Sequence, residues 1–215
     1  MPPSGTSKSS LRSQLRAIRH QLTAGEQDIA ANKLAYLVNR QAFFKRSHKI
    51  AYYWANDGEL SLHPLYLRAE QHNKHGYLPI LKPGVDNSLL FLPFSRESAL
   101  RNNRYGIPEP DIGVDNAAPL WTLDVVFLPL VGFDRWGNRL GMGAGYYDRT
   151  FARLHLRPQK PLLIGIGYSC QQVERLPTEP WDIPVDAIIT ENRVWCSPAN
   201  TGRLFQRGDC EYFLS

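Results

Sequence analysis

The sequence predicts a single α/β domain of the Rossmann-like type, with a mainly parallel sheet and helices on both faces. Short apolar runs alternate along the chain with longer segments whose apolar side chains recur at helical spacing. The 215 residues, 43% of them hydrophobic, suffice for one large core and are too few for two sizeable domains. We therefore expect one domain over residues 1–215, with residues 1–7 as a disordered tail.

Two helices are expected at the N-terminus. Residues 8–22 carry leucine and isoleucine at helical spacing, and the basic side chains of this segment form an adjacent stripe: Lys8, Arg12, Arg16 and Arg19. Thr23 and Glu26 fit a capping box, which starts a second helix running to about Phe44. The chain holds no acid before Glu26 and is rich in Ser and Arg there, so a mitochondrial transit peptide is an alternative.

The remaining elements follow from apolar runs and turn chemistry. Six strands are expected: His48–Trp54, Tyr77–Leu81, Leu89–Phe94, Leu123–Leu130, Pro161–Ser169 and Val185–Thr190. Helices are expected over residues 60–72, with Pro64 in the first turn, and over Ala144–Leu156. Turn residues fill 56–59, and residues 105–119 are expected to form a loop.

Composition excludes several classes of protein. No apolar run approaches the length needed to cross a bilayer, and the three cysteines show neither a disulfide framework nor zinc-ligand spacing. We expect a cytoplasmic protein without a membrane partner. The net charge of +5 and the pI near 9.2 favour an anionic partner, although a basic surface that only aids solubility explains them equally well.

A glycine-rich segment follows the most apolar of the expected strands. It runs "LPLVGFDRWGNRLGMGAGYYDRT" from Leu128 to Thr150 and leads into the next expected helix. Open α/β sheets bind ligands at such junctions, and Gly141, Gly143 and Gly145 allow an anion to approach the backbone closely. The G-x-G-x-G spacing matches no generic phosphate fingerprint, so a tight structural turn remains an alternative.

The residues that flank these glycines favour a phosphate site. Arg139 supplies a guanidinium that can pair with phosphate, and Asp148 supplies a carboxylate that can hold Mg²⁺. Tyr146 and Tyr147 add flat surface and hydroxyl groups, and one of the two is expected to pack in the core.

This segment, read on to Phe151, resembles the signature of the 5-formyltetrahydrofolate cyclo-ligases, also called methenyltetrahydrofolate synthetases. The likeness continues in the family's order through four other stretches: "KSSLR", "YYWANDGELSL", "RYGIPEP" and "PWDIPVDAIITENRVW". The resemblance implies a fold of the cyclo-ligase type and an enzyme that acts on small molecules. The implied reaction uses ATP and Mg²⁺ to convert 5-formyltetrahydrofolate to 5,10-methenyltetrahydrofolate, with release of ADP and phosphate. We also expect a monomer.

The same resemblance assigns site residues. It places the ATP site at Lys8, Arg12, Arg139, Gly141, Gly143, Gly145 and Tyr147. It places the folate at Trp54, Glu59, Met142 and Tyr146, and metal positions at Asp148 and Asp186. It makes Arg139, Tyr146 and Asp148 the expected catalytic residues. Many members carry a cation where this chain has Met142 and Ala144, so phosphate binding is expected to depend more on Lys8 and Arg12.

Simpler roles stay open for three of these residues. Trp54 also fits the core, and Glu59 also fits an exposed turn. Asp186 also fits a residue that accepts backbone hydrogen bonds at a strand start, although Asp182 fits that turn role better.

Two other functions fit parts of the pattern. A nucleic-acid-binding protein would use Arg12, Arg16 and Arg19 on phosphates and the paired tyrosines for stacking. A sugar-phosphate isomerase or an acyl-transfer enzyme would bind only a substrate phosphate in the glycine segment, and would need no ATP. In the cyclo-ligase reaction, by contrast, the formyl oxygen is first phosphorylated so that N10 can close the ring.

Overall fold

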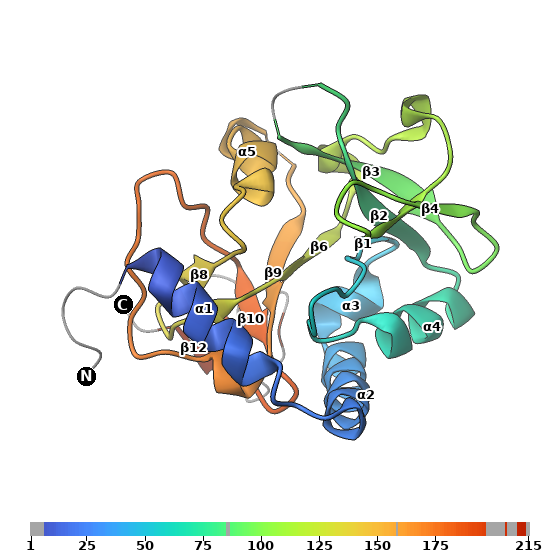
Figure 1. The fold of residues 1–215 in the computed structure, drawn as a ribbon. Helices are drawn as coiled ribbons and strands as arrows, with labels where there is room; N and C mark the ends of the chain where they lie inside the picture. The colour runs from blue at the N-terminus through green and yellow to red at the C-terminus, as the bar shows by residue number, and fades with distance from the viewer. Residues whose placement is uncertain (1–6, 85–86, 158, 197–204, 206–209, 214–215) are drawn as a thin grey trace.

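An eight-stranded sheet runs through the molecule (Figure 1). The computed structural model describes residues 7–84, 87–157, 159–196, 205 and 210–213. Within them the strands of this sheet are β1 (Lys49–Ala51), β2 (His75–Leu81), β3 (Leu89–Phe94), β6 (Val125–Pro129), β9 (Leu162–Ile166), β10 (Ala187–Ile189), β11 (Val194–Cys196) and β12 (Glu211–Tyr212). Their order is β12-β11-β10-β9-β6-β1-β2-β3. The central strands from β10 to β2 are all parallel, while β3 and β11 run antiparallel to β2 and β10. The predicted mainly parallel sheet is confirmed.

Two small hairpins and a set of helices complete the described chain. The hairpins are β4 (Leu100–Asn102) with β5 (Pro108–Pro110), and β7 (Gly132–Phe133) with β8 (Arg139–Leu140). The α-helices are α1 (Lys8–Arg19), α2 (Ala24–Arg40), α3 (Ala42–Arg46), α4 (His63–Gln71) and α5 (Tyr146–Phe151). Short 3₁₀ turns lie at Val114–Asn116, Leu120–Thr122, Leu154–Leu156 and Ser169–Gln171.

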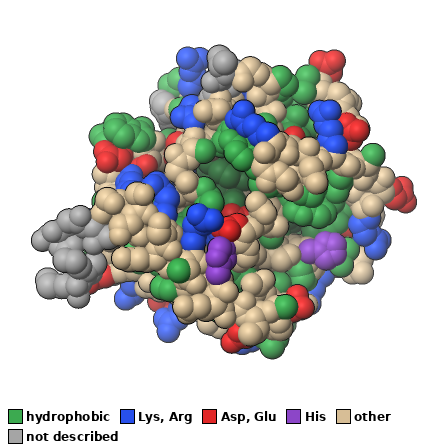
Figure 2. Space-filling view, viewed as in Figure 1, with side chains coloured by type: hydrophobic (Ala, Val, Ile, Leu, Met, Phe, Trp, Pro, Cys, Tyr) green, Lys and Arg blue, Asp and Glu red, His purple; other side chains and the backbone are tan. Residues whose placement is uncertain are grey.

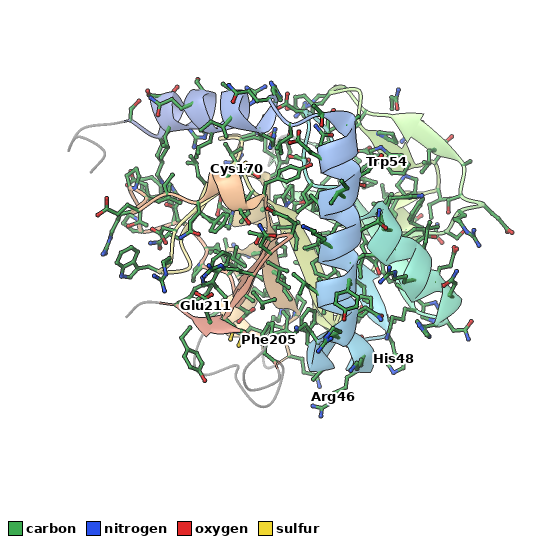
Figure 3. The ribbon with its side chains drawn as sticks, turned by 90° about the horizontal axis from the view of Figure 1, so that it is seen from below. Arg46, His48, Trp54, Cys170, Phe205 and Glu211 are labelled. Carbon is green, nitrogen blue, oxygen red and sulfur yellow. The ribbon has the colours of Figure 1, made fainter. Side chains whose placement is uncertain are left out.

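Alternate side chains of the sheet enter two separate cores. Along β6, Val125 and Phe127 point to one face and Val126 and Leu128 to the other, as the period of two in a strand requires. Helices α2, α3 and α4 cover the first face, and Figure 3 shows α2 and α4 side by side there. Helix α5 packs on the second face through Phe151. Helices therefore cover both faces, as predicted.

The capping box of the second helix is confirmed, but the helix ends earlier than expected. Thr23 accepts a hydrogen bond from the Glu26 amide, and Glu26 accepts one from the Thr23 amide. The chain leaves helical geometry at Gln41, where ψ is 140°, and then begins α3. Phe43 and Phe44, which follow this break, are both buried in the first core. The expected continuous helix to Phe44 did not include the break.

The chain between β6 and α5 also differs from the expectation. The sequence predicted a loop leading directly from strand to helix, but the hairpin β7–β8 lies between them. The Asp134 carboxylate holds this hairpin, because it accepts hydrogen bonds from the amides of Trp136, Asn138 and Leu176. The helix begins at Tyr146, not Ala144, because Gly145 before it has a left-handed φ of 68°.

Several other boundaries were wrong. Strand β1 ends at Ala51, so the aromatic residues up to Trp54 lie beyond its carboxyl end. Part of the expected loop over residues 105–119 forms β5. Residues 1–6 of the expected tail lie outside the described residues, while Ser7 is the N-cap of α1 and accepts a hydrogen bond from the Ser10 amide.

The strand order reverses between β1 and β6. From β1 the chain adds strands in one direction, through β2 and β3, and from β6 it adds them in the other, through β9 and β10. The connections at such a reversal diverge and leave a crevice at the carboxyl ends of the strands, which is where open α/β sheets bind ligands. Helix α1 bridges the segments that follow β1 and β6, because Arg12 contacts Gly141 and Arg16 pairs with Asp57, and these segments form the site described next.

Candidate active site

The glycine segment is lined by guanidinium groups. Arg12 on α1 donates from Nε to the Gly141 carbonyl oxygen at 2.8 Å. A Cβ added to Gly143, whose φ is 97°, would lie 3.2 Å from Arg12 Cζ, and a Cβ added to Gly145 would lie 3.1 Å from Arg149 Nη1. Both glycines are therefore needed for the backbone conformation and for the close approach of an arginine. Gly141 has no such conflict, since the nearest atom to its added Cβ is 3.9 Å away.

Arg149 was missed by the sequence interpretation. It lies on α5, where Nη2 donates to the Ala144 carbonyl oxygen and Nε to that of Asn87 at 3.3 Å. Its place one helical turn after Gly145 is the signal that could have identified it. Among the described residues no carboxylate forms an ion pair with Arg12 or Arg149. Both cations therefore bring to the glycine segment a positive charge that no described carboxylate neutralises.

Arg139 and Asp148, expected to serve phosphate and Mg²⁺ respectively, form an ion pair with each other. Arg139 on β8 donates from Nη2 to Asp148 Oδ1 and from Nε to the Ile183 carbonyl oxygen at 3.0 Å. The Ile183 amide also donates to Asp148 Oδ1, at 3.3 Å. The Arg139 side chain is 6% exposed and that of Asp148 27%, so the carboxylate still reaches solvent.

The predicted metal positions are not gathered into one cluster. Asp186 precedes β10 and its Oδ2 accepts a hydrogen bond from the Leu163 amide at 2.9 Å, which is the simpler role left open for it. In the part of the chain that the structure describes, no three His, Cys, Asp or Glu side chains group as metal ligands. Mg²⁺ often uses one carboxylate together with substrate phosphates, and Asp148 beside the arginine-lined glycines fits that arrangement.

The basic stripe of α1 docks the helix across the crevice. Lys8 Nζ pairs with Asp182 at 2.7 Å, and Asp182 also accepts the Glu179 amide in a turn. Arg16 and Arg19 both pair with Asp57, at 2.8 and 2.6 Å. Arg19 is fully buried and therefore cannot serve an external phosphate backbone, which weakens the nucleic-acid alternative.

Asp57 was not singled out by the sequence. It lies in the turn after β1 with φ of 52° and also contacts the His20 ring. Its hydrogen bond from Arg16, together with the charges of Arg19 and His20, lowers its pKa to about 2 against the opposing effect of burial. Asp57 is therefore ionised and joins this turn to α1.

Glu59 and Tyr147 come from different segments and interact electrostatically. Glu59 is half-buried and accepts a hydrogen bond from the Asn56 amide at 3.2 Å. Burial raises its pKa to about 7, while that amide and the Arg19 charge oppose the rise. Burial also raises the pKa of the Tyr147 phenol, with a further contribution from Glu59. Glu59 thus titrates near neutral pH beside a phenol that stays protonated.

Tyr146 links the glycine segment to the loop before β5. Its hydroxyl accepts a hydrogen bond from Arg104 Nη2 and lies 3.1 Å from the Tyr105 hydroxyl. Both Tyr146 and Tyr147 pack against the second core, where only one of the two was expected to do so. Met142 is 50% exposed on the same segment.

An aromatic pocket of about 480 Å³ opens beyond the end of β1. Trp54 lines it, 38% exposed and edge-on to Phe94 with ring centroids 6.1 Å apart. Trp54 is among the exposed large hydrophobic residues, so the alternative that it is a core residue is not what the structure shows. Figure 2 shows basic side chains around an apolar hollow at the centre of one face of the molecule.

The sequence model of the 5-formyltetrahydrofolate cyclo-ligase family matches residues 4–191. The chain belongs to this family. It is 42% identical over 184 residues to the 5-formyltetrahydrofolate cyclo-ligase of Haemophilus influenzae, covering 83% of this chain and 95% of that one. It is 39% identical over 181 residues to the Escherichia coli K12 enzyme, covering 84% and 98%. The predicted family and the prediction of an enzyme are confirmed.

A solved structure of the family shares the fold. The 5,10-methenyltetrahydrofolate synthetase of Aquifex aeolicus superposes with a TM-score of 0.75 and 35% identity, covering 87% of this chain and 91% of that one. Among the described residues of this cyclo-ligase family member, no helix has the length and apolar character needed to span a membrane.

Proposed function

We propose that the protein converts 5-formyltetrahydrofolate to 5,10-methenyltetrahydrofolate in a reaction that consumes ATP, requires Mg²⁺ and releases ADP and phosphate. The observation that carries the proposal is the glycine segment at the strand-order reversal, where Arg12 and Arg149 approach the backbone without a carboxylate partner among the described residues. Such a site attracts a polyphosphate. The names of the family relatives supply the folate substrate and product.

The chain's own residues divide the work between the two substrates. Arg12 and Arg149 would neutralise phosphate charge, and Lys8, which pairs with Asp182, would join them by exchanging that carboxylate for phosphate. The backbone at Gly143 and Gly145 would lie against the nucleotide. Asp148 would hold Mg²⁺ together with the phosphates, and the ion would supply further charge neutralisation. Arg139 fixes the Asp148 carboxylate through its hydrogen bond to Oδ1.

The folate would lie on the β1 side of the crevice. Glu59 in its ionised form would accept hydrogen bonds from the pterin, and Trp54 would stack on an aromatic part of the substrate. Tyr146 and Tyr147 would border the reacting groups from the glycine segment, next to Met142. The Glu59 charge contributes to the raised pKa of Tyr147, which supports a pterin bound next to the phosphate site.

The chemistry then requires two steps. The formyl oxygen attacks the γ-phosphorus, the new O–P bond forms, and the bond to ADP breaks with its electron pair leaving on ADP. N10 next attacks the activated carbon and loses its proton, and the C–O bond breaks as phosphate departs, which leaves the methenyl cation in the new ring. The arginines stabilise the charge that develops on the transferred phosphoryl group, which is the main protein contribution to such reactions.

One assay tests the proposal. The protein is mixed with 5-formyltetrahydrofolate, and the near-ultraviolet absorbance of methenyltetrahydrofolate is followed with ATP and Mg²⁺ together and with each left out. We expect signal only with both. Product without ATP would favour the acyl-transfer alternative, and no product at high enzyme concentration would overturn the proposal.

The remaining expectations belong to the same proposal. We propose a cytoplasmic monomer that uses no nucleic-acid partner. Light scattering with size-exclusion chromatography tests the monomer against the chain mass of 24.5 kDa. A steeply salt-dependent affinity for RNA would contradict the expectation that the protein uses no nucleic-acid partner.

A further inference from the structure

The aromatic pocket carries one guanidinium group at its rim. Its walls come from the residues after β1, from α4 and from the chain after β3. Tyr66 and Phe94 pack with ring centroids 4.9 Å apart, and Trp54 meets Phe94 edge-on. Arg96 contributes the basic side chain among the residues that line the pocket, and this side chain is 65% exposed. The pocket therefore offers flat apolar surface that ends in a positive charge.

Arg96 is held by Glu70, which has other partners. Arg96 Nε forms an ion pair with Glu70 Oε2. Glu70 Oε1 independently accepts a hydrogen bond from the Tyr66 hydroxyl at 2.6 Å and from the Arg96 backbone amide at 3.3 Å. Glu70 would thus remain hydrogen-bonded if the Arg96 guanidinium turned away. Exposed ion pairs contribute little stability, so exchange of Glu70 for another carboxylate costs little.

A substrate with an aromatic ring followed by a carboxylate matches this pocket. Folates have that chemistry, because an aminobenzoyl group carries one or more glutamate residues. We propose that Arg96 binds a glutamate carboxylate of the folate substrate, exchanging Glu70 for it, while the aminobenzoyl ring lies against Trp54 and Phe94. This inference rests on the proposed function and adds a residue that selects glutamylated substrates. Arg96 lines the aromatic pocket, whereas the arginines of the phosphate site contact the glycine segment, none of whose residues lines this pocket.

The test compares Arg96→Met with two substrates. One is 5-formyltetrahydrofolate, and the other is 5-formyltetrahydropteroate, which lacks the glutamate. We expect Arg96→Met to raise KM for the glutamylated substrate about tenfold, since one charge-assisted bidentate contact is lost. The kcat and the KM for the pteroate should not change, because neither depends on the glutamate.

Arg101→Met is the matched control. Arg101 is 67% exposed and pairs with Asp111 at 3.4 Å, much as Arg96 pairs with Glu70, but it does not line the pocket. It should leave both KM values unchanged. Glu70→Gln keeps an acceptor for Tyr66 and removes the competing charge, so its KM for the glutamylated substrate should stay equal or fall.

The outcomes separate this inference from the function on which it rests. If the unaltered protein converts neither substrate, the proposed function fails. If it converts both and Arg96→Met changes the two KM values equally or not at all, the reaction stands and the role of Arg96 is overturned. An equal rise of KM in Arg101→Met would also overturn it, because general surface charge would then explain the effect.

Discussion

A carboxyl group with a pKa of about 7, such as Glu59, makes stability depend on pH in a defined direction. Its unfolded pKa is 4.5, so the folded chain binds more protons than the unfolded chain between these values, and stability falls as pH rises through 7. Glu59→Gln removes this loss. We compare the free energy of unfolding of the variant with that of the unaltered protein. We expect this difference to be about 1–3 kcal/mol more favourable to the variant at pH 8 than at pH 5.

Urea unfolding of both proteins at the two pH values measures this gain. The exposed Glu97 supplies a control, because Glu97→Gln removes one surface charge without changing the site. A gain for Glu59→Gln that is the same at pH 5 and pH 8 would contradict the assignment.

Asp148 is the residue on which the proposed role of Mg²⁺ depends. Asp148→Asn retains an oxygen for Arg139 and the Ile183 amide, so the fold should survive. We expect kcat/KM to fall about 100-fold or more, because the charge that would hold the ion with the phosphates is lost. Steady-state kinetics over a range of Mg²⁺ concentrations, with circular dichroism as a check of folding, tests it. Near-normal turnover would remove Asp148 from the metal role.

The site residues that the sequence predicted are those that lie in or next to a local sequence motif. Arg139 and Asp148 flank the glycines, and Glu59 follows a turn. Arg19 and Asp57 were missed as site residues because each depends on a partner far along the chain. Side-chain pairing over such separations leaves no periodic or composition signal in one sequence. Arg149 was missed although its contacts with Ala144 and Gly145 are local.

At the scale of elements, alanine substitutions at two glycines of the glycine segment can be compared. Gly143→Ala places a side chain at φ of 97° and 3.2 Å from Arg12 Cζ, so the backbone or the arginine must move. We expect the apparent KM for ATP to rise about tenfold, which corresponds to ~1.4 kcal/mol. Gly141→Ala meets nothing closer than 3.9 Å and should leave this KM within about twofold. Equal effects in the two variants would contradict the structural difference between these glycines.

The docking of α1 predicts a second effect at this scale. Asp57→Asn removes the charge that neutralises the buried Arg19 side chain, and an uncompensated buried charge is costly. We expect a loss of about 2–4 kcal/mol at pH 7, reduced because Asp57 is 23% exposed. The difference from the unaltered protein should shrink as pH falls from about 4 toward 2, since Asp57 is then protonated.

Chemical denaturation at pH 7 and pH 3 measures the Asp57 effect. Asp115→Asn in the exposed 3₁₀ turn Val114–Asn116 is the control for loss of an acidic side chain. A pH-independent difference would show that the ion pair contributes nothing.

Elements with strong local signals were predicted and those without were not. Helix α2 has a capping box, and β6 is a continuous apolar run that is buried on both faces. The strands β7 and β8 have two residues each and are held by the Asp134 side chain, which no periodicity reveals. The break at Gln41 likewise follows from burial of the two phenylalanines after it.

For the whole molecule, nucleotide binding should stabilise the fold by mass action. At 100 times its Kd, Mg²⁺-ADP would add about 2.7 kcal/mol, which raises Tm by roughly 5–10 °C for a domain of this size. Adenosine lacks the phosphates and should give no more than a small rise under the same conditions. Thermal unfolding followed by intrinsic fluorescence measures both. Equal shifts with the two compounds would mean that the arginine-lined glycines do not bind phosphate.

The sheet as a whole was predictable in class but not in strand order. Alternation of strands and helices predicts parallel pairing, and short connections limit the topologies. The reversal between β1 and β6 depends on which edge of the sheet each later strand joins, and burial in the assembled core decides that. The crevice is therefore a property of the assembled sheet.

The docking of α1 has a consequence for synthesis of the chain. Translation produces this helix before the sheet, and its partners Gly141 and Asp182 come 129 and 174 residues after Arg12 and Lys8. After α1 leaves the ribosome, its apolar stripe stays exposed and these contacts cannot form until almost the whole sheet has been synthesised. Contacts of such long sequence separation slow folding. The phosphate site should thus be among the last parts of the nascent enzyme to form, so a truncated chain lacking the segment around Asp182 cannot assemble the site as described.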